Sequence, residues 1–583
     1  MYLEFRRTSA MKKILLTIFV LASAVFAANA DNVSKEDAIR YAQKFFGGIS
    51  ASELSVDGTG SNASAPEYYI INRTGGGFVL IAGEDSVDPI LGYSPTGRFK
   101  TSQMPDNISG WLESLEKDVL AVRELGPLPV KNSVKSVQTM RVRKTSATSA
   151  LIETAEWDQS APYNNLCTLS NGKNAVTGCV ATATAIVLRH NSYPEHGTGT
   201  LSSYTTSSSK YRIEGYSIDD HYYDWDSMPL KSSEVQSASD DAKYQIAQLI
   251  HDCGVMVGMD YGLRSSGAHT PRVVTELANH MGYSAAAQTH PKAIYNASEW
   301  ISLLKSEIDQ NRPLIYTGQD DQYGGHAFVV DGYDENDFIH VNWGWSGECN
   351  GYFNLELSVA GYRFSESQSA IIGLVPDPDG SDEGGTNLII SGPGLSITSG
   401  KLAQGTNFTV SINYFTNYGT ATFNGPVVPV LVDKNNNIKE RLCTPASVEV
   451  AGNTGSGYSS ARAEFSGCQI TGEIAFADKL TIARKNPTSG EYEPIPYDIE
   501  GGTVGSISTV PSFIRTESSY TAGDVFEFEF FSNGDAYKSL TWYFDGEMTD
   551  KPNATLTSGT HEVKLVITKD SGTETIIKEI VVR

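Results

Sequence analysis

The chain has 583 residues, of which 40% are hydrophobic, and its length suggests roughly three to five domains of ordinary size. Its formal net charge of -24 disfavours nucleic-acid binding, because an acidic surface repels phosphate backbones. A charged fraction of only 19%, with abundant Gly, Ser, Thr and Tyr, is typical of a secreted, β-rich protein and argues against disorder.

The first predicted element is an export signal at residues 1–30. The basic pair Lys12-Lys13 precedes a short apolar run, Ile14–Phe26, and Ala28-Asn29-Ala30 gives the small-x-small pattern that a signal peptidase reads. The run is too short for a membrane anchor, and the rest of the sequence has no apolar stretch long enough to span a bilayer. We expect translation to start at Met11.

A small α+β unit with a polar tail follows. Helices are predicted at Lys35–Phe46 and Ile108–Leu125, and strands at Tyr68–Ile71 and Phe78–Ala82. The tail, Lys131–Ser149, has basic residues among Ser, Thr and Ala and few apolar anchors. We interpret it as an exposed linker, the kind of segment at which proteases cut.

The central region is predicted to be a mixed α+β domain rich in aromatic residues, histidines and cysteines. Helical patterns occur at Val180–His190, Ala242–Cys253, Pro271–Met281 and Ala297–Asp309, and strand patterns at Leu314–Thr317, His326–Tyr333 and Phe338–Asn342. The six cysteines of the chain are too sparse for a disulfide framework.

The remainder of the chain is predicted to be β-rich. A Pro/Gly/Asp linker at 377–386 precedes short strands with Gly/Asn turns, and the last segment alternates apolar and polar residues cleanly. We interpret the linker carboxylates as solvated. The Asp433–Asn437 segment is interpreted as a hairpin turn, because it lacks the glycine and the terminal glutamate of a calcium loop. Whether Cys443 and Cys468 form a disulfide stays open.

Cys179 lies at the predicted start of a helix, after Thr177-Gly178. Unpaired backbone N–H groups and the positive end of the helix dipole stabilise a thiolate at that position. The alternative is a buried structural cysteine, and this segment alone does not decide between the two roles.

A nucleophilic cysteine needs a base, and His326 is the best candidate. It opens a predicted strand after Gly324 and Gly325, which allow a close approach of the backbone. Papain-type enzymes place the base histidine at a strand start roughly 130–150 residues after the cysteine, and this spacing fits that range. The alternative is a core histidine satisfied by backbone groups.

Two further segments supply supporting groups. Asn342 can accept a hydrogen bond from the imidazole and fix its tautomer, and Trp343 can shield that bond from water. Gln159 can donate a side-chain N–H to an oxyanion beside the backbone N–H of Cys179. The order Gln, Cys, His, Asn is papain-like, and the sequence lacks the zinc, serine-nucleophile and phosphate-loop motifs of rival chemistries.

These segments together resemble the streptopain-type cysteine peptidases of family C10. The similarity covers about Asn32 to Val375. It lies in Gly178–Ala185, Met259–Gly262, Gly324–Val329 and His340–Trp345, and, in the N-terminal unit, in Gly76–Val79 and Ile90–Ser94.

The resemblance implies roles for single residues. Cys179 would be the nucleophile, His326 the base and Gln159 part of the oxyanion hole, with Asn342 and Trp343 supporting the base. Gly325 would offer its backbone to substrate. A substrate-contacting serine of the family falls on Gly267, with Ser266 beside it, so the subsite preference stays open.

The expected fold class is α+β. The resemblance implies a papain-like peptidase domain at 145–376, preceded by an inhibitory prodomain and activation linker at 31–144. Two β-sandwich modules at 387–508 and 509–583 follow the linker, and the last one resembles a PKD-like module.

The expected function is a secreted or cell-surface cysteine endopeptidase made as a zymogen. Its partners would be protein or peptide substrates and its own prodomain as intramolecular inhibitor, with no nucleic acid, no integral membrane segment after signal removal, and no cofactor or metal. The alternative is an adhesin, or a protein binding carbohydrate or host proteins, with a degenerate peptidase domain. The intact set of four catalytic positions argues against that alternative.

Overall fold

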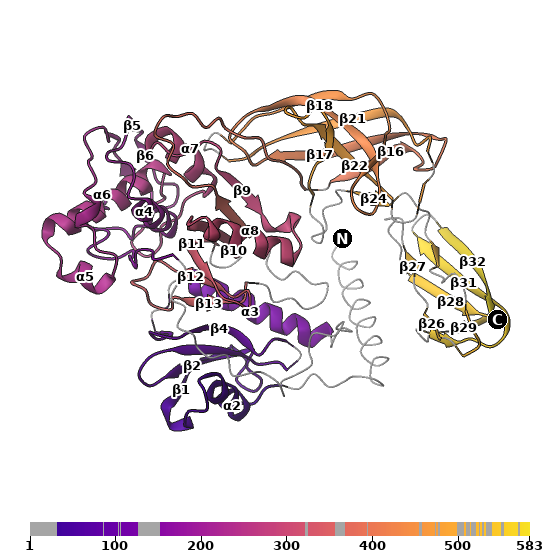
Figure 1. The fold of residues 1–583 in the computed structure, drawn as a ribbon, viewed down its shortest axis with the longest axis horizontal. Helices are drawn as coiled ribbons and strands as arrows, with labels where there is room; N and C mark the ends of the chain where they lie inside the picture. Colours follow the sequence, from indigo (N-terminus) through magenta and orange to yellow (C-terminus); the bar gives the residue numbers. More distant parts are fainter. Residues whose placement is uncertain are drawn as a thin grey trace, which may run out of the picture.

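The computed structural model describes residues 32–125, 152–355 and 368–497, with short gaps inside them, and separate stretches between 506 and 582 (Figure 1). The expected signal peptide and almost all of the expected activation linker lie outside the described residues. Among the described helices, none is long and apolar enough to cross a membrane.

The N-terminal unit packs helices on both faces of an antiparallel sheet. Its elements are α2 (Lys35–Phe45), η1 (Ala51–Glu53), β1 (Leu54–Thr59), β2 (Tyr68–Arg73), β3 (Phe78–Ala82), β4 (Ile90–Ser94) and α3 (Asp106–Leu125). The predicted helices and strands of this unit are confirmed. Neighbouring strand residues point to opposite faces, so Ile71 packs under α2 whereas Ile70 packs under α3.

The central domain combines a helical layer with a sheet. Its helices are α4 (Cys179–Asn191), η3 (Trp225–Ser227), α5 (Ser232–Ser237), α6 (Asp240–Met256), α7 (Pro271–His280), η4 (Lys292–Ile294) and α8 (Ala297–Asp309). Its main strands are β9 (Gln288–Pro291), β10 (Leu314–Asp320), β11 (Gly324–Tyr333), β12 (Ile339–Asn342), β13 (Gly351–Phe353) and β14 (Ser369–Ile372). Two-residue strands β5 to β8 lie at Thr200–Leu201, Tyr204–Thr205, Arg212–Ile213 and Tyr216–Ser217. The predicted helices and strands of this domain are confirmed.

One continuous sheet joins the N-terminal unit to the central domain, a feature that the sequence did not predict. The strand order is β1-β2-β3-β4-β13-β12-β11-β10-β14-β9. The junction is the antiparallel pair β4–β13, in which Gly92 faces Phe353 and Tyr93 faces Tyr352. The two units therefore share a backbone ladder (Figure 1) as well as apolar cores.

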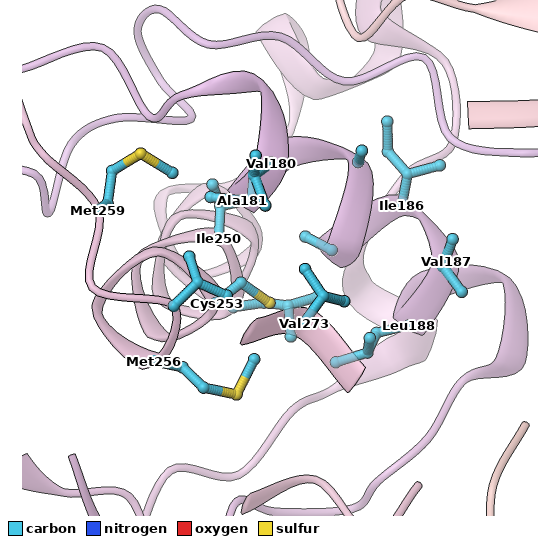
Figure 2. Packing of buried hydrophobic residues seen from close by; sticks show 14 of the residues in the cluster. Val180, Ala181, Ile186, Val187, Leu188, Ile250, Cys253, Met256, Met259 and Val273 are labelled. Carbon is cyan, nitrogen blue, oxygen red and sulfur yellow. The ribbon is translucent and has the colours of Figure 1, made fainter. Parts of the chain in front are cut away.

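Strand β11 separates two apolar cores. Ala327 and Val329 belong to the core around α4 and α6, which Figure 2 shows with Met259 beside the start of α4. Phe328 and Val330 belong to the opposite core, which contains residues of both α3 and α8. The second core is thus built partly from the N-terminal unit.

Two β modules complete the chain. The first has a four-stranded and a six-stranded sheet around one apolar core. Its strands are β15 (Leu388–Ile390), β16 (Leu395–Gly400), β17 (Asn407–Asn417), β18 (Phe423–Val432), β19 (Ile438–Arg441), β20 (Ala446–Val450), β21 (Ser459–Gln469), β22 (Lys479–Lys485), β23 (Tyr492–Pro494) and β24 (Ile507–Ser508). Those of the second are β25 (Phe513–Ile514), β26 (Val525–Glu527), β27 (Phe530–Phe531), β28 (Ser539–Phe544), β29 (Glu547–Thr549), β30 (Asn553–Thr555), β31 (Gly559–Lys569) and β32 (Gly572–Val582).

The two cysteines of the first β module lie close together. Cys443 and Cys468 form no disulfide in the structure. A hydrogen bond between the two thiols lowers the pKa of Cys443.

Candidate active site

Cys179 is the first residue of α4, and a sharp turn at Gly178 places it there. Gly178 has φ 88° and ψ 142°, which strongly favours glycine. A Cβ atom at Gly178 would lie 2.6 Å from the sulfur of Met259 and 3.1 Å from the carbonyl oxygen of Ser266, so a side chain here would also require Met259 to move. The partly exposed thiol consequently lies at the helix N-terminus, where the helix dipole favours the thiolate.

Gln159 lies beside this helix start. The backbone N–H of Thr177 donates to the carbonyl oxygen of Gln159 at 3.1 Å. The hydroxyl groups of Thr177 and Thr182 are hydrogen-bonded at 2.8 Å, and both residues are fully buried. The segment that carries Gln159 is thus bonded to a residue two positions before Cys179 and fixed, through Thr182, to the first turn of α4.

Asp158 organises the turn that carries Gln159, a role that the sequence analysis did not assign. One carboxylate oxygen accepts the N–H groups of Gln159 (2.6 Å) and Ser160 (2.8 Å). The other accepts the hydroxyl group of Ser346 at 2.7 Å, which lies just after Trp343. Aspartate commonly stabilises turns in this way. The only sequence feature that could have indicated this role of Asp158 is its place in the Trp-Asp-Gln-Ser segment.

His326 lies at the start of β11 and contacts the N-terminal unit. Because side chains alternate along a strand, His326 shares the face of Phe328, which belongs to the core containing α3. A Cβ atom built on Gly110 of α3 would lie 2.5 Å from Nε2 of His326. The backbone of α3 is therefore in direct contact with the imidazole ring, and the absence of a side chain at Gly110 permits that contact.

Asn342 is paired with Val329 of β11, on the neighbouring strand. Its side-chain amide donates to the carbonyl of Ala155 (2.9 Å) and the hydroxyl of Thr154 (3.0 Å), while its side-chain oxygen accepts the N–H of Gly344 (3.1 Å). These bonds join the start of the domain to the loop after β12. The predicted bond from His326 to Asn342 stays a prediction.

Trp343 connects the base strand to α3. It is buried, with its ring centroid 4.8 Å from that of Phe328 and 6.0 Å from that of Trp111 in α3. Its indole N–H donates to the carbonyl of Cys349 at 3.1 Å. The same indole that was predicted to shield the base thus also packs against the N-terminal unit.

Ser266 and Gly267 lie in the loop that approaches Gly178. Ser266 is buried, where its hydroxyl accepts the N–H of Gly262 (3.0 Å) and donates to the carbonyl of Val176 (2.7 Å). Gly267 is exposed, and a Cβ atom there would meet nothing within 4 Å. Ser266 therefore holds the loop in place, whereas Gly267 has open space beside it, and contact of either residue with substrate stays a prediction.

The remaining predicted residue is Gly325, which lies in β11 directly before His326 and opposite Gln319 of β10. Within the described ranges, no group of three or more His, Cys, Asp or Glu side chains is arranged to hold a metal ion.

Comparison with known proteins identifies the families of the N-terminal unit and of the central domain. Residues 157–353 match the Peptidase C10 family, and residues 30–119 match the Spi protease inhibitor family. Streptopain from Streptococcus pyogenes serotype M28 is 32% identical over 392 residues, which cover 61% of this chain and 96% of streptopain. The chain belongs to the C10 family of cysteine peptidases. Its N-terminal unit is accordingly an inhibitor-type prodomain.

Two other relatives match a similar share of the chain. The thiol protease/hemagglutinin PrtT of Porphyromonas gingivalis is 29% identical over 391 residues, 63% of this chain and 44% of PrtT. A prointerpain A fragment from Prevotella intermedia is 29% identical, with a TM-score of 0.45, and the match covers 55% of this chain and 98% of the fragment. The two family matches end before the β modules of this C10 peptidase.

Proposed function

We propose that this C10 peptidase is a secreted endopeptidase, made as a zymogen, that cleaves proteins through a thioester on Cys179. The observation that carries the proposal is the direct contact between Gly110 of the prodomain and the ring of His326, the candidate base for the Cys179 thiol at the start of α4. The export signal in the sequence supports secretion.

The reaction follows from the roles of the side chains. The Cys179 thiolate attacks the carbonyl carbon of the scissile peptide bond, and the oxyanion is bound by the N–H of Cys179 and the Gln159 amide. His326 gives its proton to the leaving amine, which departs and leaves a thioester. Water then attacks the thioester while His326 takes its proton, and the carboxylate product leaves with Cys179 restored.

The zymogen is held inactive by α3. Helix α3 contacts His326 through Gly110 and packs Trp111 on Trp343, and we infer that these contacts withhold the base from Cys179 while the helix is docked. A cut in the linker leaves the β4–β13 ladder and the shared core intact. We therefore expect activity to appear only when the prodomain dissociates or is degraded, after the cut.

A peptide-library digest followed by mass spectrometry tests the proposal. The processed wild type should cleave internal peptide bonds and form an acyl adduct on Cys179, whereas Cys179→Ala should do neither. Gln159→Ala should lower kcat by roughly 10²–10³-fold with little change in KM, as expected for loss of an oxyanion donor.

The contrary results are equally specific. Cleavage by Cys179→Ala equal to that of the wild type would exclude Cys179 as nucleophile. A processed wild type that cleaves nothing while its β modules bind glycans or host proteins would favour a binding protein with a degenerate peptidase domain.

A further inference from the structure

The first β module is hydrogen-bonded to the peptidase domain at α7. The side-chain amide of Asn453 donates to the carbonyl of Pro271 at 2.6 Å, and the hydroxyl of Thr275 donates to the carbonyl of Asn453 at 3.2 Å. Both bonds are made to the first turn and a half of α7. Asn453 is 3% exposed, so this contact is shielded from water.

Further bonds attach the module near β9. The hydroxyl of Thr420 donates to the carbonyl of Ala285 at 2.6 Å, and the amide of Asn387 donates to the carbonyl of Thr289 at 3.1 Å. The first β module therefore touches the peptidase domain along α7 and the segment that leads into β9 (Figure 1).

The loop that presents Asn453 is fixed within the module. The N–H of Asn453 donates to the carbonyl of Gly419 at 2.8 Å. A Cβ atom at Gly452 would lie 2.0 Å from the carbonyl oxygen of Thr420, so only glycine allows the two loops to pack this closely. Two contacting segments of the module, those of Thr420 and Asn453, thus form one rigid face.

Helix α7 in turn adjoins the substrate loop. Pro271 directly follows residues 263–270, and the N–H of Arg272 donates to the carbonyl of His269 in that loop at 3.1 Å. A Cβ atom at Gly258 would lie 2.2 Å from the Arg272 guanidinium, and the next residue, Met259, packs against Gly178. Figure 2 shows Val273 of α7 in the same core as the start of α4.

We propose that Asn453 is a positioning residue, through which the first β module fixes α7 and thereby sets the conformation of the substrate loop 263–270. This inference rests on the proposed function and on the expectation that Ser266 and Gly267 contact substrate, because it assigns the loop to substrate binding. The contacts fix α7, which adjoins the loop, so their loss should weaken the binding of peptide and leave the chemical steps unchanged.

The test compares matched variants of the full chain after processing. Thr275→Val removes the hydroxyl at nearly constant shape, Thr275→Ser keeps it, and Asn453→Asp replaces the donor with an acceptor facing a carbonyl. Asn435→Ala, in an exposed turn of the same module, is the control. Measurements are KM and kcat for a peptide that extends several residues before the cut, an epoxide count of active Cys179, and hydrogen exchange of residues 258–275.

Thr275→Val and Asn453→Asp should raise KM roughly three- to tenfold, the loss expected for one or two buried hydrogen bonds, with kcat within about twofold. Hydrogen exchange of the loop should accelerate in both, while Thr275→Ser and Asn435→Ala should match the wild type. Unchanged KM and exchange in both variants would overturn the inference. If exchange accelerates but the epoxide fails to label even the wild type, the proposed function fails while the effect of the module on the loop, through α7, stands.

Discussion

The peptidase domain has two neighbours, and the two interfaces differ in chemistry. The prodomain shares two apolar cores with it and extends its sheet through β4–β13. The first β module instead places Asn and Thr side chains on backbone carbonyls, and none of the apolar clusters of described residues combines peptidase and module side chains. Burial of apolar surface gives strength without direction, whereas hydrogen bonds fix geometry at modest net gain. Burial of apolar surface therefore supplies most of the affinity of the prodomain for the peptidase domain, whereas directional hydrogen bonds set the orientation of the first β module.

Trp111→Ala should have the largest effect on the prodomain interface. The partly buried indole packs on Trp343 and on Phe353, with ring centroids 6.0 and 4.9 Å away. Its loss should weaken docking of the prodomain by about 2 kcal/mol, less than for a fully buried tryptophan. The fraction of zymogen molecules with an undocked prodomain should therefore rise roughly 30-fold. The measurement is the rate at which an epoxide labels Cys179 of the uncut zymogen. A rate equal to that of Leu120→Ala, an exposed position on α3, would contradict a shared core.

Asp118 should make prodomain docking depend on pH. This carboxyl of α3 is 8% exposed, and burial raises its pKa to about 8, against smaller opposing effects of Lys292 and Lys117. The docked state thus holds a proton that the released state gives up near pH 4, so docking weakens as pH rises from 4 toward 8. The rate of epoxide labelling of Cys179 in the zymogen, divided by the rate in the processed enzyme, should rise at least about tenfold between pH 5 and 8.

Asp118→Asn should remove this dependence, because the amide does not titrate. Because the zymogen is labelled through its undocked state, any titration of Cys179 and His326 affects both labelling rates equally and cancels in their ratio. A ratio with the same slope in the wild type and in Asp118→Asn would show that another group controls docking.

Gly110→Ala should stabilise helix α3 through its higher helix propensity and destabilise docking of α3 through a steric clash. Alanine favours a helix interior by about 1 kcal/mol over glycine. Its Cβ atom would lie 2.5 Å from Nε2 of His326, and such overpacking costs about 1–3 kcal/mol. We expect the clash to win and zymogen labelling to rise several-fold. Slower labelling would mean that α3 can shift away from the imidazole without loss of docking.

The smallest effect is expected at the module interface. Asn387→Ala removes one hydrogen bond to β9 and should lower the free energy of unfolding by about 1 kcal/mol. Because none of the hydrogen bonds described above for this interface involves α3, zymogen labelling should change less than twofold. Thermal unfolding and epoxide labelling of the same sample check both statements, and a large increase in labelling would show that the two interfaces are coupled.

The sequence predicted what depends on local periodicity. Helix α4 and strand β11 were placed within a residue or two, because small residues after Cys179 and the apolar run after His326 carry clear signals. The junction at β13 was not predicted, because three residues are too few for a strand pattern and their partner lies far away in sequence. The contact between Gly110 and His326 was missed for a similar reason. A glycine within a helical pattern shows only that something approaches closely, not what.

The account depends most on His326 being withheld from Cys179 by α3. The direct measurement is the rate of epoxide labelling of Cys179 in the unprocessed chain, the processed enzyme and processed His326→Ala. We predict fast labelling of the processed enzyme alone, with the other two slower by roughly 100-fold or more, as expected when the activating imidazole is absent. Equal rates for the unprocessed chain and the processed enzyme would contradict the account.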